Sequence, residues 1–435
     1  MANKRLLIIS PYFPPVNAAD MQRVRMSLPY FKALGWEAEV IMVHETYVDM
    51  VKDTLLLKAI PNEIAIHKVK ALPKKWTSKF GLGSIALRSL WYIRRKGNQL
   101  LKDKNFDLIY FSTTQFPVCI LGPYWKRRFN IPYIIDMQDP WHSEYYQFKP
   151  KKERPKKYWF SYRLNKYLEP KALKDADGLI SVSKAYIDTI HERYPILKEK
   201  PTSIITFGAF EPDFDIAKSA EYDSPMIYNQ DDELKHLVYV GRGGNDMSLS
   251  LNLLFNAFAQ GLKNEPILFN QLKMHFIGTS YAPKGKGIKT VAPLAAQMGL
   301  ADYIQEHTDR IGFYESIKYL QNAHGLIIIG SEQASYTASK LYPYILANKP
   351  LLSIFHQESS AYKILSKCQA GQVIDITQGS AAVYQTFRSY IEDVFSSKQP
   401  LINWEAFKPF NASYLTAKQT AVFEQVINLY KQTRL

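Results

Sequence analysis

The chain alternates short apolar runs with longer stretches in which apolar residues recur every three or four positions. Uninterrupted apolar runs are typical of parallel strands buried on both faces, and the longer stretches are typical of helices. In the first half the apolar runs are Arg5–Ser10, Ala38–Val43, Asp107–Phe111, Pro132–Asp136, Gly178–Val182 and Ser203–Thr206. Strands separated by helices predict right-handed βαβ units and a parallel sheet.

A second series of the same kind begins at residue 236. Its runs are His236–Val240, Lys273–Ile277, Gly325–Ile329 and Pro350–Ile354, and an amphipathic stretch over Tyr414–Tyr430 follows. The two series are separated by Glu211–Glu233, which is acidic and shows no sustained periodicity. We therefore predict two doubly wound α/β domains, over residues 1–213 and 235–411, joined by a linker over 214–234.

Composition narrows the class of protein. With 46% apolar and 22% charged residues, the 435-residue chain does not have the composition of a disordered, collagen-like or coiled-coil protein. Its two cysteines, Cys119 and Cys368, lie far apart, which excludes a disulfide framework or a zinc ribbon and indicates a reducing compartment. No apolar run approaches the roughly 20 residues that a membrane span needs. We expect a cytoplasmic protein.

The excess of positive over negative charge lies entirely in the first half. Residues 1–210 hold 35 Lys and Arg against 19 Asp and Glu, a net +16, whereas residues 211–435 hold 20 against 21, a net −1. A surface of one sign attracts anionic lipids or other polyanions. We therefore predict a basic patch that contacts the inner face of the cell membrane or an acidic acceptor. Its candidate residues are Arg94, Arg95, Lys96, Lys151 and Lys152. No nucleic-acid recognition module is present, so nucleic acid is not an expected partner.

The stretch Lys74–Leu101 has two interpretations. Its apolar residues form a stripe at helical spacing, with Arg88 and the Arg94–Lys96 triplet nearby. A basic amphipathic helix can lie in a membrane interface. The alternative is a helix that packs its stripe on the first sheet and turns its charges outward.

Several motifs follow predicted strands, where open α/β sheets bind ligands. Gly241-Arg242-Gly243-Gly244 is suited to a phosphate, because glycines admit close approach and a guanidinium grips two oxygens. The alternative is a flexible turn with a solvated arginine. Ser339-Lys340 begins a predicted helix, a second anion-binding arrangement or simply a capped surface helix.

A pair of carboxylates ends the Pro132–Asp136 strand. Asp136 and Asp139, followed by His142, could hold a sugar hydroxyl or stabilise a developing oxocarbenium ion, or they could be capping and packing residues. The nine histidines show no metal-ligand spacing, so no metal is expected.

Six segments, in order along the chain, resemble those of one family. They are ISPYFPPVNAADMQRVR from Ile9, IIDMQDPW from Ile134, ADGLISVS from Ala176, ITFGAFEPDFD from Ile205, HLVYVGRGG from His236 and SYTASKLYPYILANKPLL from Ser335. Together they resemble GT-B glycosyltransferases, specifically glycosyltransferase family 4. The resemblance implies two Rossmann-like domains that face a cleft, with the C-terminal helix 412–435 crossing back to the first domain.

The resemblance also implies a reaction. The expected reaction transfers a sugar, of the hexosyl kind, from a nucleotide-sugar donor to a carbohydrate or lipid-linked glycan acceptor. It is expected to be retaining and to need neither a metal nor a cofactor. The expected pathway is cell-surface polysaccharide biosynthesis. Asp139, Asp136 and His142 are then the catalytic candidates. The donor contacts are Gly241, Arg242, Gly243, Gly244, Ser339, Lys340, Glu332 and Ser335, and the first-loop contacts are Asn17, Ala18 and Arg23.

The chain departs from the family pattern at four places. Asn17-Ala18-Ala19 replaces a frequent glycine pair, and no lysine follows Arg242 closely. Gln138 takes the place of a frequent histidine. Ser335 and Pro343 stand where most members have two glutamates, with Glu332 as a substitute for the first. These differences leave two other hypotheses open: a non-catalytic glycan- or partner-binding relative, and a sugar-nucleotide epimerase.

Overall fold

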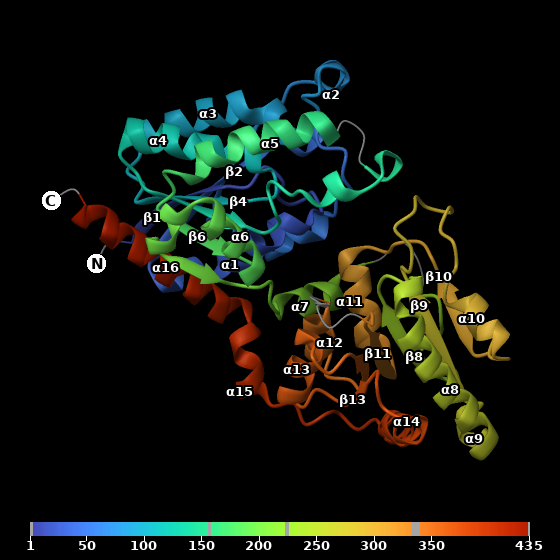
Figure 1. Ribbon diagram of the computed structural model, residues 1–435. Coiled ribbons are helices and arrows are strands. Elements are labelled where there is room, and N and C mark those ends of the chain that lie inside the picture. Colours follow the sequence, from blue (N-terminus) through green and yellow to red (C-terminus); the bar gives the residue numbers. More distant parts are fainter. Residues whose placement is uncertain (1–2, 155–157, 222–225, 333–339, 434–435) are drawn as a thin grey trace. The chain divides into compact units, whose positions relative to one another are not determined.

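The computed structural model describes residues 3–154, 158–221, 226–332 and 340–433. The chain divides into two compact units. Unit 1 is Met1–Phe207 with Ala412–Leu435, and unit 2 is Gly208–Asn411. Each unit is a parallel sheet covered by helices on both faces, so the predicted fold class is confirmed (Figure 1).

The sheet of unit 1 has seven parallel strands in the order β3-β2-β1-β4-β5-β6-β7. The strands are β1 Lys4–Ile9, β2 Trp36–Val43, β3 Ala65–Val69, β4 Leu108–Ser112, β5 Tyr133–Met137, β6 Gly178–Ser181 and β7 Thr202–Ile204. Leu6, Leu7, Ile8 and Ile9 of the central β1 are fully buried, as expected for a strand covered on both faces.

Two layers of helices cover this sheet. The helices are α1 Gln22–Phe31, α2 Lys74–Thr77, α3 Ile85–Asp103, α4 Leu121–Phe129, α5 Tyr158–Leu173, α6 Lys184–Arg193 and α16 Ala412–Gln432. In Figure 1 α3, α4 and α5 lie along one side of the sheet, and α1, α6 and α16 lie along the other.

Helix α16 completes the core of unit 1. The Phe423 ring lies 5.3 Å from Trp36, 5.1 Å from Tyr110 and 6.2 Å from Phe31, measured between ring centroids. Gly178 admits the close approach, since a Cβ there would come within 2.6 Å of the Val426 side chain. The predicted return of the C-terminal helix to the first domain is therefore confirmed.

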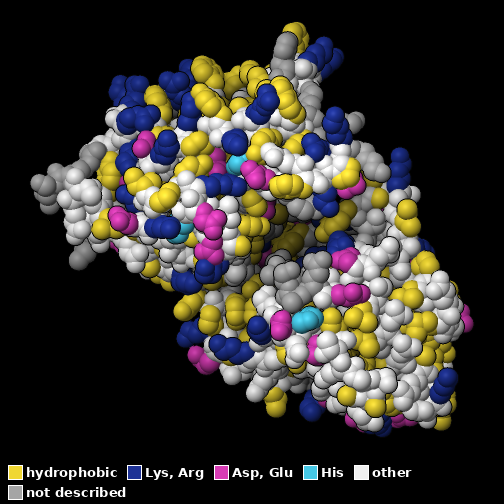
Figure 2. Space-filling model, viewed as in Figure 1, with side chains coloured by type: hydrophobic (Ala, Val, Ile, Leu, Met, Phe, Trp, Pro, Cys, Tyr) yellow, Lys and Arg dark blue, Asp and Glu magenta, His cyan; other side chains and the backbone are white. Residues whose placement is uncertain are grey.

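The stripe on α3 faces inward. Ile85, Ala86, Ser89, Ile93, Gly97 and Leu100 are buried. Leu82, which the stripe included, is exposed in the turn before the helix. Arg88 is buried as well, and its guanidinium donates to the carbonyls of Leu72 (2.7 Å) and Tyr47 (3.0 Å). The interpretation of α3 as a helix packed on the sheet is therefore confirmed. Lys and Arg side chains gather on the outer side of the α3 and α4 layer (Figure 2), and their contact with a membrane stays a prediction compatible with this packing. No helix in the described ranges combines the length and apolarity needed to cross a lipid bilayer.

The sheet of unit 2 has six parallel strands in the order β10-β9-β8-β11-β12-β13. The strands are β8 Lys235–Val240, β9 Leu272–Ile277, β10 Ile304–His307, β11 Gly325–Ile329, β12 Leu351–Phe355 and β13 Gln372–Asp375. Alternate residues face opposite sides: Leu237 and Tyr239 belong to one hydrophobic cluster, whereas Val238 belongs to the other.

The helices of unit 2 supply both clusters. The helices are α7 Pro212–Ser219, α8 Ser248–Asn264, α9 Pro266–Phe269, α10 Ala292–Gln297, α11 Phe313–Asn322, α12 Leu341–Leu346, α13 Ser360–Lys367, α14 Ser380–Phe395 and α15 Trp404–Phe407. Helices α8 and α14 pack on one face of the sheet, and α11, α12 and α13 pack on the other.

The predicted linker over 214–234 begins inside a helix. Helix α7 spans Pro212–Ser219 and buries Asp213, Ile216 and Ala217. The Tyr314 hydroxyl of α11 donates to Asp213 at 3.0 Å, which holds α7 in unit 2. Unit 1 ends at Phe207, before the predicted boundary at 213. Periodicity could not show α7 because the helix has only eight residues and begins at a proline.

Candidate functional site

Three cationic side chains lie together at the carboxyl edge of the unit 2 sheet. Arg242 follows β8, Arg310 follows β10, and Lys340 immediately precedes α12. The Lys340 ammonium lies 3.3 Å from the position that a Cβ on Gly241 would take. Loss of water and the positive charges of Arg310 and Arg242 lower the pKa of Lys340 below its usual range. A bound anion would therefore be stabilised by all three charges.

The guanidinium of Arg242 grips a carboxylate of its own chain. Its Nη1 and Nη2 donate to the Asp246 oxygens at 2.9 Å and 2.6 Å, and this pair lowers the pKa of Asp246. Asp246 belongs to a short 3-10 turn, η10 (Asn245–Met247). Such a two-pronged geometry also fits two phosphate oxygens, so a phosphate would compete with Asp246 for Arg242.

Backbone hydrogen bonds hold the glycine loop against the end of β9 and the residues that follow it. The N–H groups of Gly241 and Gly243 donate to Ile277 (2.9 Å) and Thr279 (2.8 Å). A Cβ on Gly243 would lie 2.9 Å from the Thr290 hydroxyl, which explains the glycine. These two N–H groups are therefore engaged within the sheet, and phosphate binding by this loop stays a prediction.

A buried carboxylate organises the loop that carries Thr279 and Thr290. Glu306 of β10 accepts the Thr279 hydroxyl at 2.7 Å and the N–H groups of Val291 (2.9 Å) and Ala292 (2.8 Å). These bonds fix the start of α10 against the β9 loop. The loop that contains Thr279 and the start of α10 are thus tied to β10.

The structure describes only some of the remaining candidates of unit 2. Glu332 is exposed at the end of the loop after β11. Ser335 and Ser339 lie outside the described residues. The helix predicted to begin at Lys340 is confirmed as α12, which starts at Leu341.

In unit 1, Asp136 and Arg23 form a buried ion pair. Arg23 Nε donates to Asp136 at 2.6 Å, and the two side chains are 2% and 0% exposed. The same carboxylate oxygen also accepts from Tyr110 (3.2 Å), Ser112 (2.9 Å) and Gln138 (2.8 Å). Arg23 further donates to the Ile205 carbonyl. These two candidates therefore join α1 to the sheet in the interior of unit 1, and a role in ligand contact stays a prediction.

Asp20 is a second buried carboxylate, which the sequence analysis did not select. It lies in the 3-10 turn η1 (Ala19–Met21) and accepts the Thr113 hydroxyl, the Thr114 N–H and the Thr114 hydroxyl at 3.0–3.1 Å. Burial raises the pKa of Asp20. It thereby ties the loop after β1 to the loop after β4.

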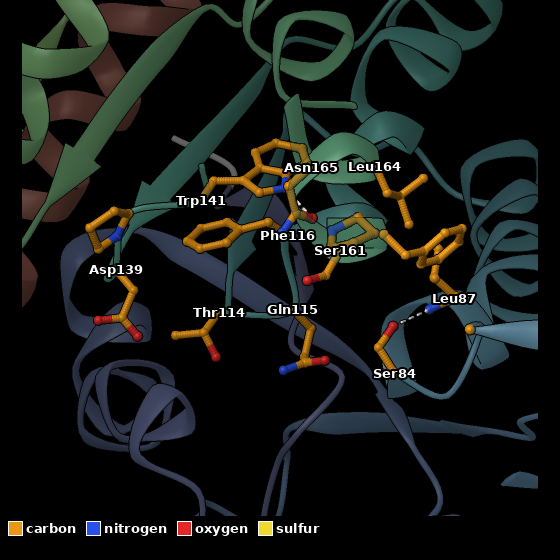
Figure 3. Close-up of a pocket in the computed structure, with 14 residues that line it drawn as sticks. Ser84, Leu87, Thr114, Gln115, Phe116, Asp139, Trp141, Ser161, Leu164 and Asn165 are labelled. Carbon is orange, nitrogen blue, oxygen red and sulfur yellow. Dashed lines mark hydrogen bonds between the residues drawn. The ribbon is translucent and has the colours of Figure 1, made fainter. Parts of the chain in front are cut away.

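Asp139 lies at the edge of a pocket of about 310 Å³ in unit 1 (Figure 3). The pocket is walled by the Phe116 and Trp141 rings, stacked 5.4 Å apart, with Leu87, Phe160 and Leu164. Figure 3 shows Asp139, Thr114, Gln115 and Ser84 along one edge of it. Partial burial and the charge of Asp20 raise the pKa of Asp139. Apolar walls with hydroxyl, amide and carboxyl groups suit a saccharide or an amphiphile.

His142, Asn17 and Ala18 do not reach this pocket. His142 is buried beside the Tyr162 ring, and burial together with Arg193 lowers its pKa. Ala18 is buried, and Asn17 N–H donates to the Val51 carbonyl at 2.9 Å. Of the catalytic candidates, Asp139 alone lines the pocket.

Two arginines of the predicted basic patch lie against aromatic rings. Arg94 lies 4.5 Å above the Tyr124 ring of α4, Arg95 lies 5.6 Å from Trp91, and Lys96 donates to Gln99. Lys151 is exposed in a separate 3-10 turn, and the Lys152 side chain lies outside the described part. Within the described ranges no group of three or more His, Cys, Asp or Glu side chains is arranged to hold a metal ion.

Two residues were missed for different reasons. Arg310 follows β10, a short edge strand with the sequence IQEH. This sequence contains no apolar run, so the hydrophobic pattern did not predict the strand. Had that strand been recognised, the loop after it would have pointed to Arg310. Asp20 carries no sequence signal of its own, since a carboxylate in a loop is usually solvated.

Comparison with known proteins found a family-model match over one segment of the chain. Residues 29–206, most of unit 1, match the family model of Glycosyltransferase Family 4. The resemblance stated from the sequence is therefore supported by a family-model match over this segment. No curated protein matches the chain in sequence.

Solved structures similar to the whole chain have the GT-B fold. A glycosyltransferase from Rickettsia africae ESF-5 has 13% identity and a TM-score of 0.56, over 98% of this chain and 99% of that one. An α,α-trehalose 6-phosphate synthase from Burkholderia multivorans has 11% identity and a TM-score of 0.57, over 100% and 99%. Anabaena HepE, solved in complex with UDP, has 14% identity and a TM-score of 0.51, over 99% of both chains. At these identities the comparison shows the fold, and the chain is a GT-B protein.

Proposed function

We propose that this GT-B protein, with a family 4 segment in its first unit, transfers a glycosyl group from a nucleotide-sugar donor. The observation that carries the proposal is the gathering of Arg242, Arg310 and Lys340 at one sheet edge. The leaving nucleoside diphosphate gains negative charge as the glycosidic bond breaks. Fixed cations stabilise that charge more than the charge of the ground state, which lowers the barrier.

The donor diphosphate is proposed to bind unit 2, as UDP is the ligand named for the HepE structure. Arg242 exchanges Asp246 for phosphate oxygens, and Arg310 and Lys340 complete the site. Three side-chain cations supply the charge that a divalent ion supplies in other transferases, so we propose a metal-independent reaction. The proposal that the reaction is retaining rests on the resemblance to family 4 alone. A hexosyl donor is the proposed substrate.

The acceptor is proposed to bind unit 1 at the Asp139 pocket. Its carboxyl group, with a raised pKa, is suited to hold an acceptor hydroxyl or to take its proton. The polar edge of Thr114, Gln115 and Ser84 offers further hydrogen bonds to a sugar. We propose a carbohydrate or lipid-linked glycan as acceptor, in cell-surface polysaccharide biosynthesis, with the protein at the inner face of the cell membrane.

The donor half of the proposal is tested by measuring release of nucleoside diphosphate from a panel of UDP-, GDP- and ADP-sugars. Arg242→Ala, Arg310→Ala and Lys340→Ala should each weaken binding of the diphosphate by roughly 1.5–3 kcal/mol, about 10- to 150-fold. Lys263→Ala, an exposed lysine of α8, is the matched control and should bind as the unaltered protein does. Unchanged binding by all three site variants would refute the donor site.

The same assay separates the rival hypotheses. A non-catalytic relative, suggested by Ser335 and Pro343 in place of the two glutamates, would bind nucleotide without releasing diphosphate when acceptors are added. An epimerase would change the sugar while the nucleotide stays attached. Release that depends on both donor and acceptor distinguishes a transferase from both.

A further inference from the structure

Unit 1 exposes large apolar side chains at the end of its outer helical layer. Trp76 is 74% exposed, Leu82 41%, Phe148 83% and Trp159 64%. These four residues, called here the aromatic patch, belong to α2, to the turn before α3, to the 3-10 turn η7 (Tyr145–Phe148) and to α5. Single exposed apolar side chains are common on protein surfaces, but several on adjoining segments mark a site of interaction.

The segments that carry the aromatic patch are in contact with one another. The Phe160 ring of α5 lies 3.0 Å from the position of a Cβ on Gly81, beside Leu82. The Tyr146 ring of η7 lies 5.6 Å from Tyr158, at the start of α5. The four side chains are therefore exposed on adjoining segments of one unit.

Cations surround the aromatic patch. Lys75, Lys79, Arg163 and Lys166 are exposed, and Arg163 lies 4.4 Å from the Trp159 ring. Figure 2 shows hydrophobic and Lys or Arg side chains intermixed over this part of unit 1. Lys74 is paired with Asp49 and adds less to the field. Tryptophan with Lys and Arg is the composition of surfaces that lie at the headgroup level of a bilayer.

We propose that the aromatic patch docks unit 1 on an anionic lipid surface. Trp76, Phe148 and Trp159 enter the headgroup layer, while Lys75, Lys79, Arg163 and Lys166 contact the lipid phosphates. A soluble acidic polysaccharide would satisfy the cations equally. It has no apolar interior to receive Trp76 and Phe148, and this difference favours the membrane.

This surface is distinct from the Arg94–Lys96 triplet. The triplet lies about ten residues from the start of α3, roughly 15 Å along the helix axis. Arg94 is already occupied by the Tyr124 ring. The triplet adds long-range attraction, and insertion takes place at the aromatic patch.

The docked orientation has a consequence for the substrate, which rests on the proposed function. Gly81, Ser84, Phe160 and Ser161 line the Asp139 pocket and lie beside the aromatic patch in sequence. Docking therefore brings the pocket to the bilayer surface. We infer that the acceptor is an amphiphile whose apolar part stays in the membrane while its sugar reaches Asp139.

The test is binding of the full chain to vesicles, measured by sedimentation and by quenching of tryptophan fluorescence with brominated lipid. The vesicles are phosphatidylcholine alone, or phosphatidylcholine and phosphatidylglycerol in equal amounts. We expect binding to the mixed vesicles only, with quenching. The double variant Trp76→Ala/Trp159→Ala should bind at least about tenfold more weakly, since each ring removes a large apolar area from water.

The matched control is Trp404→Ala, which removes a half-exposed tryptophan of unit 2 and should bind vesicles as the unaltered protein does. Phe148→Ser is a second probe that leaves all tryptophans in place. If the double variant and Phe148→Ser both bind as tightly as the unaltered chain, or if the chain binds polygalacturonate but ignores mixed vesicles at low salt, the proposal is wrong. Release of diphosphate from the donor in solution needs no vesicle, so its failure is seen separately.

Discussion

The Arg23–Asp136 pair allows a sharp test of what Asp136 does. Asp136 was a candidate for catalysis, but its side chain is fully buried and holds the Arg23 guanidinium at 2.6 Å. Asp136→Asn keeps the shape of the side chain and removes its charge. The Arg23 cation then remains in the interior without a counter-charge, which is the costly way to break a buried ion pair.

The structure sets the size of the effect. Arg23 is 2% exposed, so water cannot replace the lost carboxylate, and the bond from Arg23 to the Ile205 carbonyl does not neutralise it. Removal of one partner of such a pair costs roughly 3–5 kcal/mol. For a unit of this size that cost lowers the melting temperature by roughly 6–20 °C.

Thermal unfolding followed by tryptophan fluorescence is the suitable assay. Six of the seven tryptophans, all but Trp404, belong to unit 1, so the signal reports that unit. The matched control is Asp139→Asn, three residues away at the edge of a pocket that solvent reaches, which should shift stability by about 0.5 kcal/mol or less. A melting temperature of Asp136→Asn close to that of the control would refute the buried-pair reasoning and return Asp136 to the list of groups that act on a substrate.

Three further predictions follow from the site and the core. Asp139→Asn should lower turnover far more than donor affinity, because its carboxyl group acts on the acceptor. Steady-state kinetics and calorimetric titration with the diphosphate check this. Unchanged turnover would make Asp139 a packing residue. Asp246→Asn should raise affinity for the diphosphate roughly twofold to fivefold, since an exposed ion pair that competes for Arg242 is lost; calorimetry that shows weaker binding would contradict this. Burial lowers the pKa of His275 to about 3 and that of His324 to about 4, so the unfolded chain takes up protons first as the pH falls below about 6.5. Stability of unit 2 should therefore be full above pH 6.5 and decline toward pH 4, by up to about 3 kcal/mol for His275; urea unfolding across that range checks it, and His275→Gln should flatten the profile.

The interior of both sheets could be predicted from the apolar runs, and the failures lie at the edges. β3, β10 and β13 were missed, and each is an outermost strand of its sheet. The β10 residues Gln305 and Glu306 alternate exposed and buried, and Glu306 serves the loop network instead of the apolar core. An edge strand has one neighbour and needs no continuous apolar run, so the pattern that reveals central strands does not reveal it.

The site could be predicted only in part, for a similar reason. Arg242, Lys340 and Asp139 were found because they follow central strands, while Arg310 follows an edge strand. Asp136 was selected because charged residues at strand ends usually face solvent, and Arg23 because the resemblance to family 4 implied first-loop contacts. Their mutual pairing across more than one hundred residues of sequence is a tertiary fact that no local pattern contains.

The return of α16 to unit 1 orders the events of synthesis. Unit 2 is an insertion, complete once residue 411 has left the ribosome, whereas unit 1 waits for Phe423 and its neighbours. At about 5–20 residues per second, the interval between Phe207 and the end of α16 is roughly 10–45 s. During that time the apolar surface formed by Phe31, Trp36 and Tyr110 has no cover. A stop codon just before α16 would therefore leave unit 2 complete and deprive unit 1, which lies mostly before it in the chain, of part of its core.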